Sequence, residues 1–398
     1  SYRRAIEIKP DFTNAHFNLG NVLKDLGRLK EAEISYRKAI QIKPDFAEAH
    51  SNLGGILIDL GKLKDAEISL RKAIELKPDL AEAHSNLSYI LLKQKNFKEG
   101  FNQYEWRVDS NDTKSLIRLL LKTKKPEWTP NHKGKVLLWE EQGIGDKILF
   151  ASLIPELNNL VDQLIVQVDE RLIPLFKRSF SQRIIYLNKD QLIDEESYDS
   201  HIAMGSLLKF LRKSKEDFKK GKKQYLQVNQ MKSTIFKEKL KDFDHQKIVG
   251  ISWKSTSKRD KGVKLSLERF ILGIYSPQLK FVCLQYGDVE KEITQLRKKH
   301  RIKIEIINEL DLFNDIDGLA SLIAACDEVV STENVTLHLA GAIGIKTNVL
   351  LSHNCYWYHG VDDKKSYWFS NVNFFRQKKY DEWDVPLKEI KNEIKTNN

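Results

Sequence analysis

The sequence has few of the residues that cross-link a chain or anchor it in a membrane. Its three cysteines, Cys283, Cys326 and Cys355, are odd in number and widely spaced. They offer no disulfide framework and no metal-ligand spacing, so we expect a reducing, cytoplasmic compartment. No apolar run approaches the roughly 20 residues of a membrane-spanning helix. No signal peptide is visible, and because the chain opens without methionine in the middle of a repeat, we expect its natural N-terminus to lie upstream.

Basic residues exceed acidic ones, and the formal net charge is +11. Much of the excess lies in residues 207–241, which hold twelve lysines or arginines and three acidic residues. We interpret this segment as a solvated, lysine-rich insertion in preference to a patch for a phosphate-bearing acceptor or an anionic membrane surface. No aromatic residues alternate with the lysines as they would for stacking on bases, so we expect no nucleic-acid partner.

The N-terminal third is repetitive. Pro10, Pro44 and Pro78 lie 34 residues apart, the segment 13–46 recurs as 47–80, and a decayed third copy begins at Ala81. A period of this length is typical of solenoids built from helix pairs. Residues 1–12 are interpreted as the second helix of an earlier repeat.

The positions shared by the copies match the tetratricopeptide (TPR) signature. Gly20 and Ala32 are small because we expect the two helices of a repeat to cross closely there, and Pro44 ends the second helix. We therefore predict an α-solenoid over residues 1–125. The signature residues are Leu19, Gly20, Leu23, Ala32, Tyr36, Ala39 and Pro44, and then Leu53, Gly54, Leu57, Ala66, Leu70, Ala73 and Pro78.

Asn18, Asn52 and Asn86 also recur every 34 residues. Equivalent positions of a solenoid line up along one face, and a column of amides can hydrogen-bond an extended peptide without reading its sequence. An equally good interpretation is that the repeats copy their residues and each Asn bonds a neighbouring turn. The column resembles the asparagine ladder of eukaryotic O-linked GlcNAc transferase, and that resemblance implies a groove that binds a protein or peptide.

After Lys125-Pro126 short β-branched runs alternate with helical patterns, which predicts parallel sheets covered by helices. The lysine-rich segment divides the strands into two sets and predicts two Rossmann-like lobes, over 126–245 and 246–398. Such lobes bind ligands at the carboxyl ends of their strands. We expect strands over 136–139, 164–168, 183–187 and 201–204, and over 247–253, 280–286, 302–307, 328–331 and 347–351. We expect helices over 147–159, 171–179, 266–275, 288–299, 316–325 and 335–343.

The first candidate stretch at the end of a strand contains Gln142, Gly143, Gly145 and Asp146. Glycines let the backbone turn tightly near a ligand. Asp146 could accept a proton from an acceptor hydroxyl. The alternative is an ordinary aspartate at a helix N-terminus, which satisfies free N–H groups and the helix dipole.

Two further stretches follow strands of the second set. Lysines between 254 and 264 could neutralise a diphosphate, or could be surface lysines. In the segment 331–342, a helix N-terminus offers N–H groups to phosphate, with contacts from Glu333, Asn334 and Thr336. We expect His338, one turn into that helix, to be a packed structural residue.

Gly145-Asp146, Lys264 and the run from Glu333 to Ala342 together resemble the lipopolysaccharide heptosyltransferase family, and still more the bacterial TPR-linked glycosyltransferases with that module. The resemblance covers essentially the whole chain. It implies a GT-B fold with an acceptor-side lobe, a donor-side lobe and a closing helix. It also implies an inverting sugar transfer from a nucleotide sugar, independent of metal and cofactor. The implied roles are a catalytic base for Asp146, phosphate neutralisation for Lys264, donor contacts for Glu333, Asn334, Val335 and Thr336, and nucleoside contacts for Gln285 and Tyr286.

The family usually carries Asp-Thr where this chain has Glu333-Asn334. This difference favours one alternative to an enzyme, a non-catalytic TPR scaffold with a degenerate transferase-like module. A second and less favoured alternative is a nucleic-acid binder driven by the charge of 207–241. The identities of the donor and acceptor, and the oligomeric state, are left open.

Overall fold

The computed structural model describes residues 1–108, 121, 123–219, 224–241, 247–255, 265–379 and 381–395. Lys264, the predicted phosphate-neutralising residue, lies outside these ranges. The chain forms two compact units. The first combines Ser1–Leu120 with Tyr356–Val361, and the second combines Leu121–Cys355 with Asp362–Asn398.

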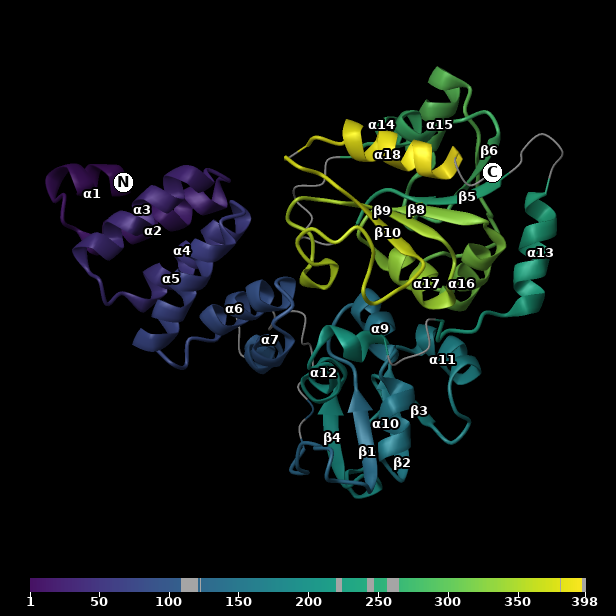
Figure 1. The fold of residues 1–398 in the computed structure, drawn as a ribbon, viewed down its shortest axis with the longest axis horizontal. Helices are drawn as coiled ribbons and strands as arrows, with labels where there is room; N and C mark the ends of the chain where they lie inside the picture. Colours follow the sequence, from purple (N-terminus) through teal and green to yellow (C-terminus); the bar gives the residue numbers. More distant parts are fainter. Residues whose placement is uncertain are drawn as a thin grey trace. The chain divides into compact units, whose positions relative to one another are not determined.

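The first unit is a stack of helix pairs, as the 34-residue period predicts (Figure 1). A single helix, α1, precedes the first complete pair. Each predicted repeat begins where the first helix of a pair begins. The helices are α1 (Tyr2–Ile8), α2 (Thr13–Asp25), α3 (Leu29–Ile42), α4 (Ala47–Asp59), α5 (Leu63–Leu76), α6 (Ala81–Lys93) and α7 (Phe97–Tyr104).

Glycines occupy the points where the two helices of a pair touch. A Cβ added to Gly20 would lie 2.6 Å from the Tyr36 ring, and one added to Gly54 would lie 2.5 Å from Leu70. Both partners are fully buried. Core packing leaves no room for another carbon at such separations, so these two positions set how closely the helices approach.

A second 34-residue periodicity, missed in the sequence, fixes the turn before each pair. One histidine in the first helix of every pair donates from Nε2 to the carbonyl oxygen of the proline six residues earlier. Each bond satisfies the carbonyl of a proline in the turn that joins the preceding helix to the next one. The pairs are His16–Pro10 at 2.9 Å, His50–Pro44 at 2.9 Å and His84–Pro78 at 2.8 Å.

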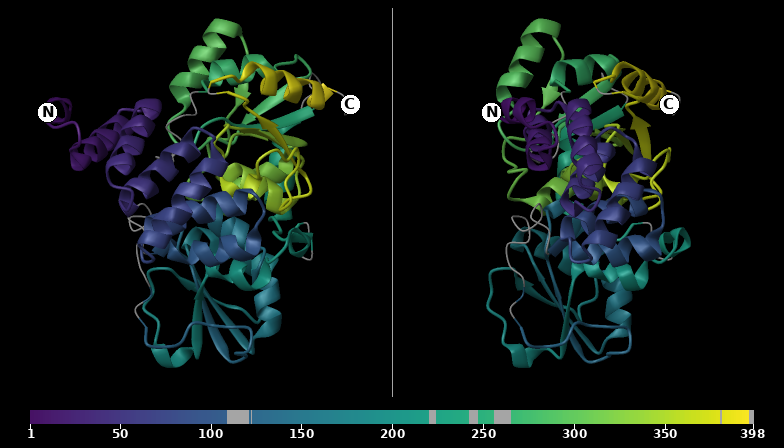
Figure 2. Two further views of the ribbon diagram at one scale, coloured as in Figure 1. Left: turned by 60° about the vertical axis from the view of Figure 1, so that its left-hand side comes forward. Right: turned by 90° about the vertical axis from the view of Figure 1, so that its left-hand side faces the viewer.

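The second unit contains two separate parallel sheets, which confirms the predicted alternation (Figures 1 and 2). The four-stranded sheet has the order β3-β2-β1-β4. Its strands are β1 (Lys135–Trp139), β2 (Gln163–Val168), β3 (Ile185–Asn188) and β4 (Ser200–Ala203). Its helices are α9 (Ile144–Ala151), α10 (Ile154–Leu160), α11 (Ile173–Ser179) and α12 (Leu207–Leu211).

The six-stranded sheet has the order β10-β9-β8-β5-β6-β7. The order reverses between β5 and β8, which creates the switch point at which such sheets bind ligands. Its strands are β5 (Lys247–Ser252), β6 (Leu279–Cys283), β7 (Ile304–Glu305), β8 (Glu328–Ser331), β9 (Thr347–Leu351) and β10 (Val372–Arg376). Its helices are α13 (Gln230–Leu240), α14 (Leu267–Ile274), α15 (Glu290–His300), α16 (Ile316–Ala325), α17 (Val335–Ile343) and α18 (Asp384–Lys395).

The structure differs from the sequence expectations in several places, and the strand expected over 302–307 is reduced to β7, Ile304–Glu305. The helix expected over 147–159 divides into α9 and α10, because Pro155 sits in the first turn of α10 and cannot continue a helix. Strand β10, which pairs with β9, was not expected. The lysine-rich segment 207–241 is more than a solvated insertion, since it forms α12 and α13 and buries Phe218 and Tyr225.

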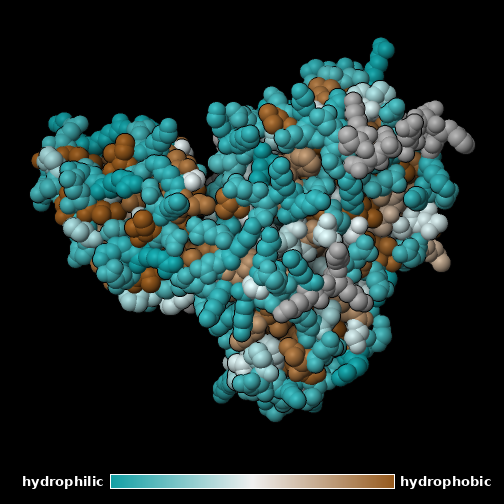
Figure 3. All heavy atoms as spheres, in the orientation of Figure 1, coloured by the Kyte–Doolittle hydropathy of each residue, from teal (hydrophilic) through white to brown (hydrophobic). Residues whose placement is uncertain are grey.

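No helix in the described ranges is long and apolar enough to cross a bilayer. The space-filling view shows a largely hydrophilic face with scattered apolar side chains (Figure 3). Among the exposed apolar residues, Ile34 and Ile68 occupy equivalent positions of successive repeats. Single exposed apolar residues of this kind are normal on a protein surface.

Two neighbouring glycines of α4 test the packing of the repeats. Gly54→Ala should lower the free energy of unfolding by about 1–3 kcal/mol, because its Cβ would collide with Leu70. Gly55→Ala should raise it by about 0.5–1 kcal/mol, since the nearest atom, Nδ2 of Asn86, is 3.7 Å away and alanine favours the helix. Urea unfolding of the full chain followed by circular dichroism measures both. Equal effects would contradict the close crossing.

Candidate functional site

The loop after β1 is tied to the ends of the neighbouring strands by two glutamates. Glu140 accepts a hydrogen bond from the backbone N–H of Asp169, after β2, at 2.5 Å and forms an ion pair with Lys147 at 2.6 Å. Glu141 accepts from the N–H of Gly205, after β4, at 2.8 Å. These charge-assisted bonds fix the direction in which α9 leaves the sheet.

Helix α9 begins at Ile144, directly after its N-cap Gly143. Its first turn contains Gly145 and Asp146. Asp146 is partly exposed, and its Oδ2 lies 3.5 Å from where a Cβ of Gly143 would be. The carboxylate thus folds back over the helix N-terminus. This position suits an aspartate that interacts with the helix N-terminus. Gln142, just before the N-cap, is half-buried.

The first turn of α9 packs directly on the first turn of α17, a helix of the six-stranded sheet. A Cβ on Gly145 would lie 2.9 Å from Cδ2 of His338. His338 is 3% exposed and also faces Phe369, at 6.4 Å between ring centroids. The prediction that His338 is a packed residue is confirmed, and its ring forms the contact between the two sheets' helices.

Asn334 caps α17 and joins the two loops at the switch point. Its Oδ1 accepts from the backbone N–H of Thr336 at 3.0 Å and from the hydroxyl of Ser331 at 3.1 Å. Its Nδ2 donates to the hydroxyl of Ser252 at 2.8 Å and to the carbonyl of Lys254 at 3.3 Å. A threonine here could cap the helix but could not make all four bonds, because a hydroxyl has one proton to donate.

Gln285 holds the same loop from the other side. Its Oε1 accepts from the hydroxyl of Ser252 at 3.1 Å and from the backbone N–H groups of Trp253 and Lys254, each at 3.0 Å. The side chain is 1% exposed. Gln285 therefore shapes the end of β5, while its predicted companion Tyr286 is the partly exposed member of the pair.

The other predicted donor residues surround this network. Glu333 and Val335 are partly exposed, whereas Thr336 is fully buried. Within the described part of the chain, the Thr336 hydroxyl has no hydrogen-bond partner. Lys254, which we counted among the lysines of this stretch, forms an ion pair with Glu292 at 2.6 Å.

Two arginines that the sequence analysis missed connect the two sheets. Arg171 holds Asp169 through two bonds of 2.9 Å and donates to the carbonyl of Phe313 at 3.1 Å. Burial by itself would raise the pKa of Asp169, but the hydrogen bonds from Arg171 outweigh it and lower that pKa to about 2. Arg178 forms a bidentate pair with Asp317 of α16, with Nη1–Oδ1 at 2.5 Å and Nη2–Oδ2 at 3.0 Å.

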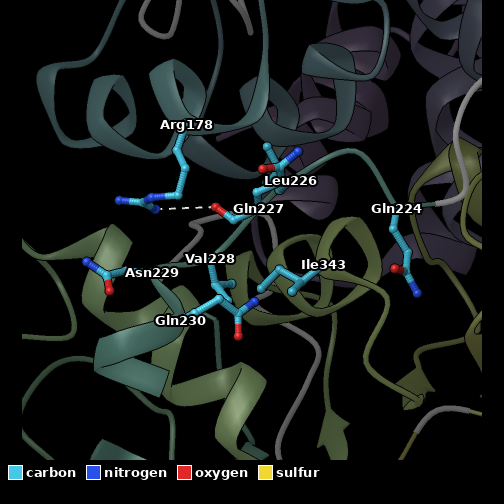
Figure 4. Close-up of a pocket in the computed structure, with 8 residues that line it drawn as sticks. All are labelled: Arg178, Gln224, Leu226, Gln227, Val228, Asn229, Gln230 and Ile343. Carbon is cyan, nitrogen blue, oxygen red and sulfur yellow. Dashed lines mark hydrogen bonds between the residues drawn. The ribbon is translucent and has the colours of Figure 1, made fainter. Parts of the chain in front are cut away.

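A cavity of about 580 Å³ lies beside Arg178, lined mainly by the segment 224–230 (Figure 4). Arg178 points across it toward the carbonyl of Gln227, at 3.3 Å. A second cavity, of about 740 Å³, lies between α14 and α18. None of the predicted site residues in the described ranges lines either cavity.

The asparagines of the repeats occupy equivalent, half-buried positions on α2, α4 and α6. Asn52 reaches back to the preceding repeat, where its Nδ2 donates to Oδ1 of Asn21 at 2.9 Å. Asn86 lies over Gly55, the position equivalent to Asn21. The column formed by Asn18, Asn52 and Asn86 therefore has inter-repeat contacts of its own.

Replacing Asn334 should cost more than removing an ordinary cap. Asn334→Ala should lower the free energy of unfolding by about 2–3 kcal/mol, since it removes a cap and leaves buried partners unsatisfied. Asn229 caps α13 through one bond of 3.1 Å to the N–H of Lys232, and Asn229→Ala should cost about 1 kcal/mol. Thermal and urea unfolding compare the two variants. A larger loss for Asn229→Ala would contradict the network.

The low pKa of Asp169 makes part of the stability acid-labile. Its folded pKa of about 2 lies below the unfolded value of about 3.9, so the stabilisation is present above pH 4 and disappears as the pH falls toward 2. Asp169→Asn should be less stable at pH 7 by about 2 kcal/mol, and the difference should shrink below pH 4. The exposed Asp162→Asn serves as a control across the same unfolding series. A difference independent of pH would contradict this assignment.

Comparison with known proteins identifies the repeats. The TPR repeat family matches residues 1–27 and 20–61, and the tetratricopeptide repeat family matches residues 47–80. Among solved structures, PilF of Pseudomonas aeruginosa is 27% identical, with a TM-score of 0.26, and the match covers 28% of this chain and 51% of that one. MamA is 22% identical, with a TM-score of 0.27, and the match covers 29% and 67%.

Protein FlbA of Caulobacter vibrioides is 28% identical over 277 residues, which cover 64% of this chain and 45% of FlbA. The chain thus spans less than half the length of this curated relative. Because the repeats make up less than a third of the chain, the similarity extends into the α/β unit. The N-terminal part of the chain consists of TPR repeats, a fold that supports a protein-interaction role, and it is followed by an α/β unit with two parallel sheets.

Proposed function

We propose that this chain transfers a sugar from a nucleotide-sugar donor to a protein or glycan acceptor, with its two sheets acting as the lobes of a GT-B transferase. The observation that carries the proposal is the contact of two helix N-termini at Gly145 and His338. Both termini present backbone N–H groups and positive dipole ends, and together they favour a dianionic group such as a diphosphate. The switch point beside α17 is where a nucleotide binds in sheets of this order.

In the proposed reaction Asp146 takes the proton from an acceptor hydroxyl. The hydroxyl oxygen then forms a bond to the anomeric carbon of the donor sugar from the face opposite the diphosphate. The bond between that carbon and the phosphate oxygen breaks, and the nucleoside diphosphate leaves with the electron pair. The N-terminus of α17 stabilises the charge that develops on the leaving group, and the resemblance implies the same role for Lys264.

The TPR repeats would recruit the acceptor or a partner protein. Their equivalent positions line up along the stack, and Asn18, Asn52 and Asn86 form one such column. Amide side chains suit an extended peptide because they can both donate and accept hydrogen bonds. The acceptor would then reach Asp146 at high local concentration.

A non-catalytic scaffold is the second candidate. It is favoured by Asn334, whose amide is already occupied by hydrogen bonds to both switch-point loops. In that case the repeats would bind a partner protein and the α/β unit would bind no nucleotide. Thermal unfolding of the chain with millimolar UDP, GDP, ADP, CDP or dTDP separates the candidates. A bound diphosphate at about 100 times its Kd should add about 2.7 kcal/mol, and no shift with any of them would favour the scaffold.

Asp146→Asn tests the catalytic assignment. The variant should lose transfer from the donor identified by the unfolding experiment, by at least about 100-fold, because the amide cannot accept the acceptor's proton. Its affinity for the nucleoside diphosphate should stay within about twofold of the wild type. Asp190→Asn, an exposed aspartate of the same sheet, is the matched control. Retained turnover in Asp146→Asn would exclude Asp146 as the base.

A further inference from the structure

The loop between β7 and α16 is a rigid turn with an aromatic residue at its tip. Asp311 accepts hydrogen bonds from the backbone N–H groups of Phe313 and Asn314, at 2.9 and 3.0 Å, and from Nδ2 of Asn314 at 2.7 Å. These bonds lower the pKa of Asp311, because they stabilise its ionised form. Asp315 then caps α16. The Phe313 side chain is nevertheless 55% exposed.

Phe313 is held from the other sheet by Arg171. The Arg171 guanidinium donates to the Phe313 carbonyl at 3.1 Å and lies 5.0 Å from the ring centroid, a cation–π distance. Its other nitrogens bind Asp169, just after β2. Arginine keeps its charge at any physiological pH, so this contact does not depend on pH in that range. An exposed aromatic ring that is fixed from both its backbone and its side has little conformational entropy to lose when a ligand stacks on it.

The position of the ring is the third observation. Tyr286 follows β6 and Phe313 follows β7, and their rings lie 6.0 Å apart at 49°. Strands β6 and β7 lie next to β5 on one side of the switch point, which is between β5 and β8. A nucleotide with its diphosphate at the switch point extends its nucleoside over those two strands.

We propose that Phe313 is the face on which the nucleobase stacks and that Arg171 is the positioning residue that holds this face. This inference rests on the proposed function and goes beyond it, because it names a contact outside the residues predicted for the donor site. Stacking tolerates every base, so Phe313 contributes affinity and does not choose the base. The base would stack on the exposed ring of Phe313, near Tyr286, whose ring centroid lies 6.0 Å away.

The test is calorimetric titration of the full chain with UDP, GDP, ADP, CDP, dTDP and inorganic pyrophosphate. Phe313→Ala should weaken binding of every diphosphate nucleotide that the wild type binds by about tenfold. Phe313→Tyr should restore affinity to within about twofold, because it keeps a ring. Affinity for pyrophosphate should not change. Leu192→Ala, which shortens a side chain that is 97% exposed on the other sheet, should behave as wild type.

Arg171→Lys keeps the positive charge beside Asp169 but loses the planar fork. As a single substitution, it should weaken nucleotide binding by a few fold. When it is combined with Phe313→Ala it should have no further effect, because the two residues act as one unit.

If the wild type binds a nucleotide and Phe313→Ala binds it equally, the stacking proposal is wrong while the proposed function stands. If pyrophosphate affinity falls in parallel, the effect is not stacking and the proposal is overturned. If the wild type binds no nucleotide, both fail.

Discussion

The contact between Gly145 and His338 is the constraint on which the α/β unit depends. Only a residue without a Cβ lets the first turn of α9 approach the first turn of α17 so closely. Other contacts of α9 with the second sheet's segments reinforce it: Tyr225 donates to the carbonyl of Ile148 at 2.8 Å, and Trp368 donates to the hydroxyl of Ser152 at 3.2 Å. The result is two positive helix ends at one point, with the carboxylate of Asp146 beside them.

Around this point the polar side chains differ in how deeply they are buried. Gln285 and Asn334 are buried, and their amides are committed to the loops after β5 and β8. Glu333 and Tyr286 are only partly buried. A site of this kind is preorganised, since its backbone N–H groups are positioned by side chains behind them before any ligand arrives. Asn334 strengthens this supporting layer, because its amide hydrogen-bonds to both loops.

The sequence predicted the architecture well because its signals were local and independent. The period of the prolines located the repeats, and alternating patterns located the strands as far as β9. Strand β10 was missed because only a closing helix was expected after the strand over 347–351. The division of α9 from α10 was missed because the effect of Pro155 was not considered. The site was harder to predict. Asp146 and Thr336 could be named from motifs, but Arg171 and Phe313 lie 142 residues apart, and only the fold brings them together. Gln285 was named for a nucleoside contact, whereas its depth of burial is a tertiary property that no pattern in the sequence encodes.

The central claim is that the meeting point of α9 and α17 binds a nucleoside diphosphate. Hydrogen–deuterium exchange measured with and without the diphosphate tests where the ligand binds, independently of any activity. The account predicts added protection in the N-terminal turns of α9 and α17 and in the loop containing Phe313, with the TPR helices unchanged. Protection confined to the cavity beside Arg178, or no protection at saturating ligand, would contradict it.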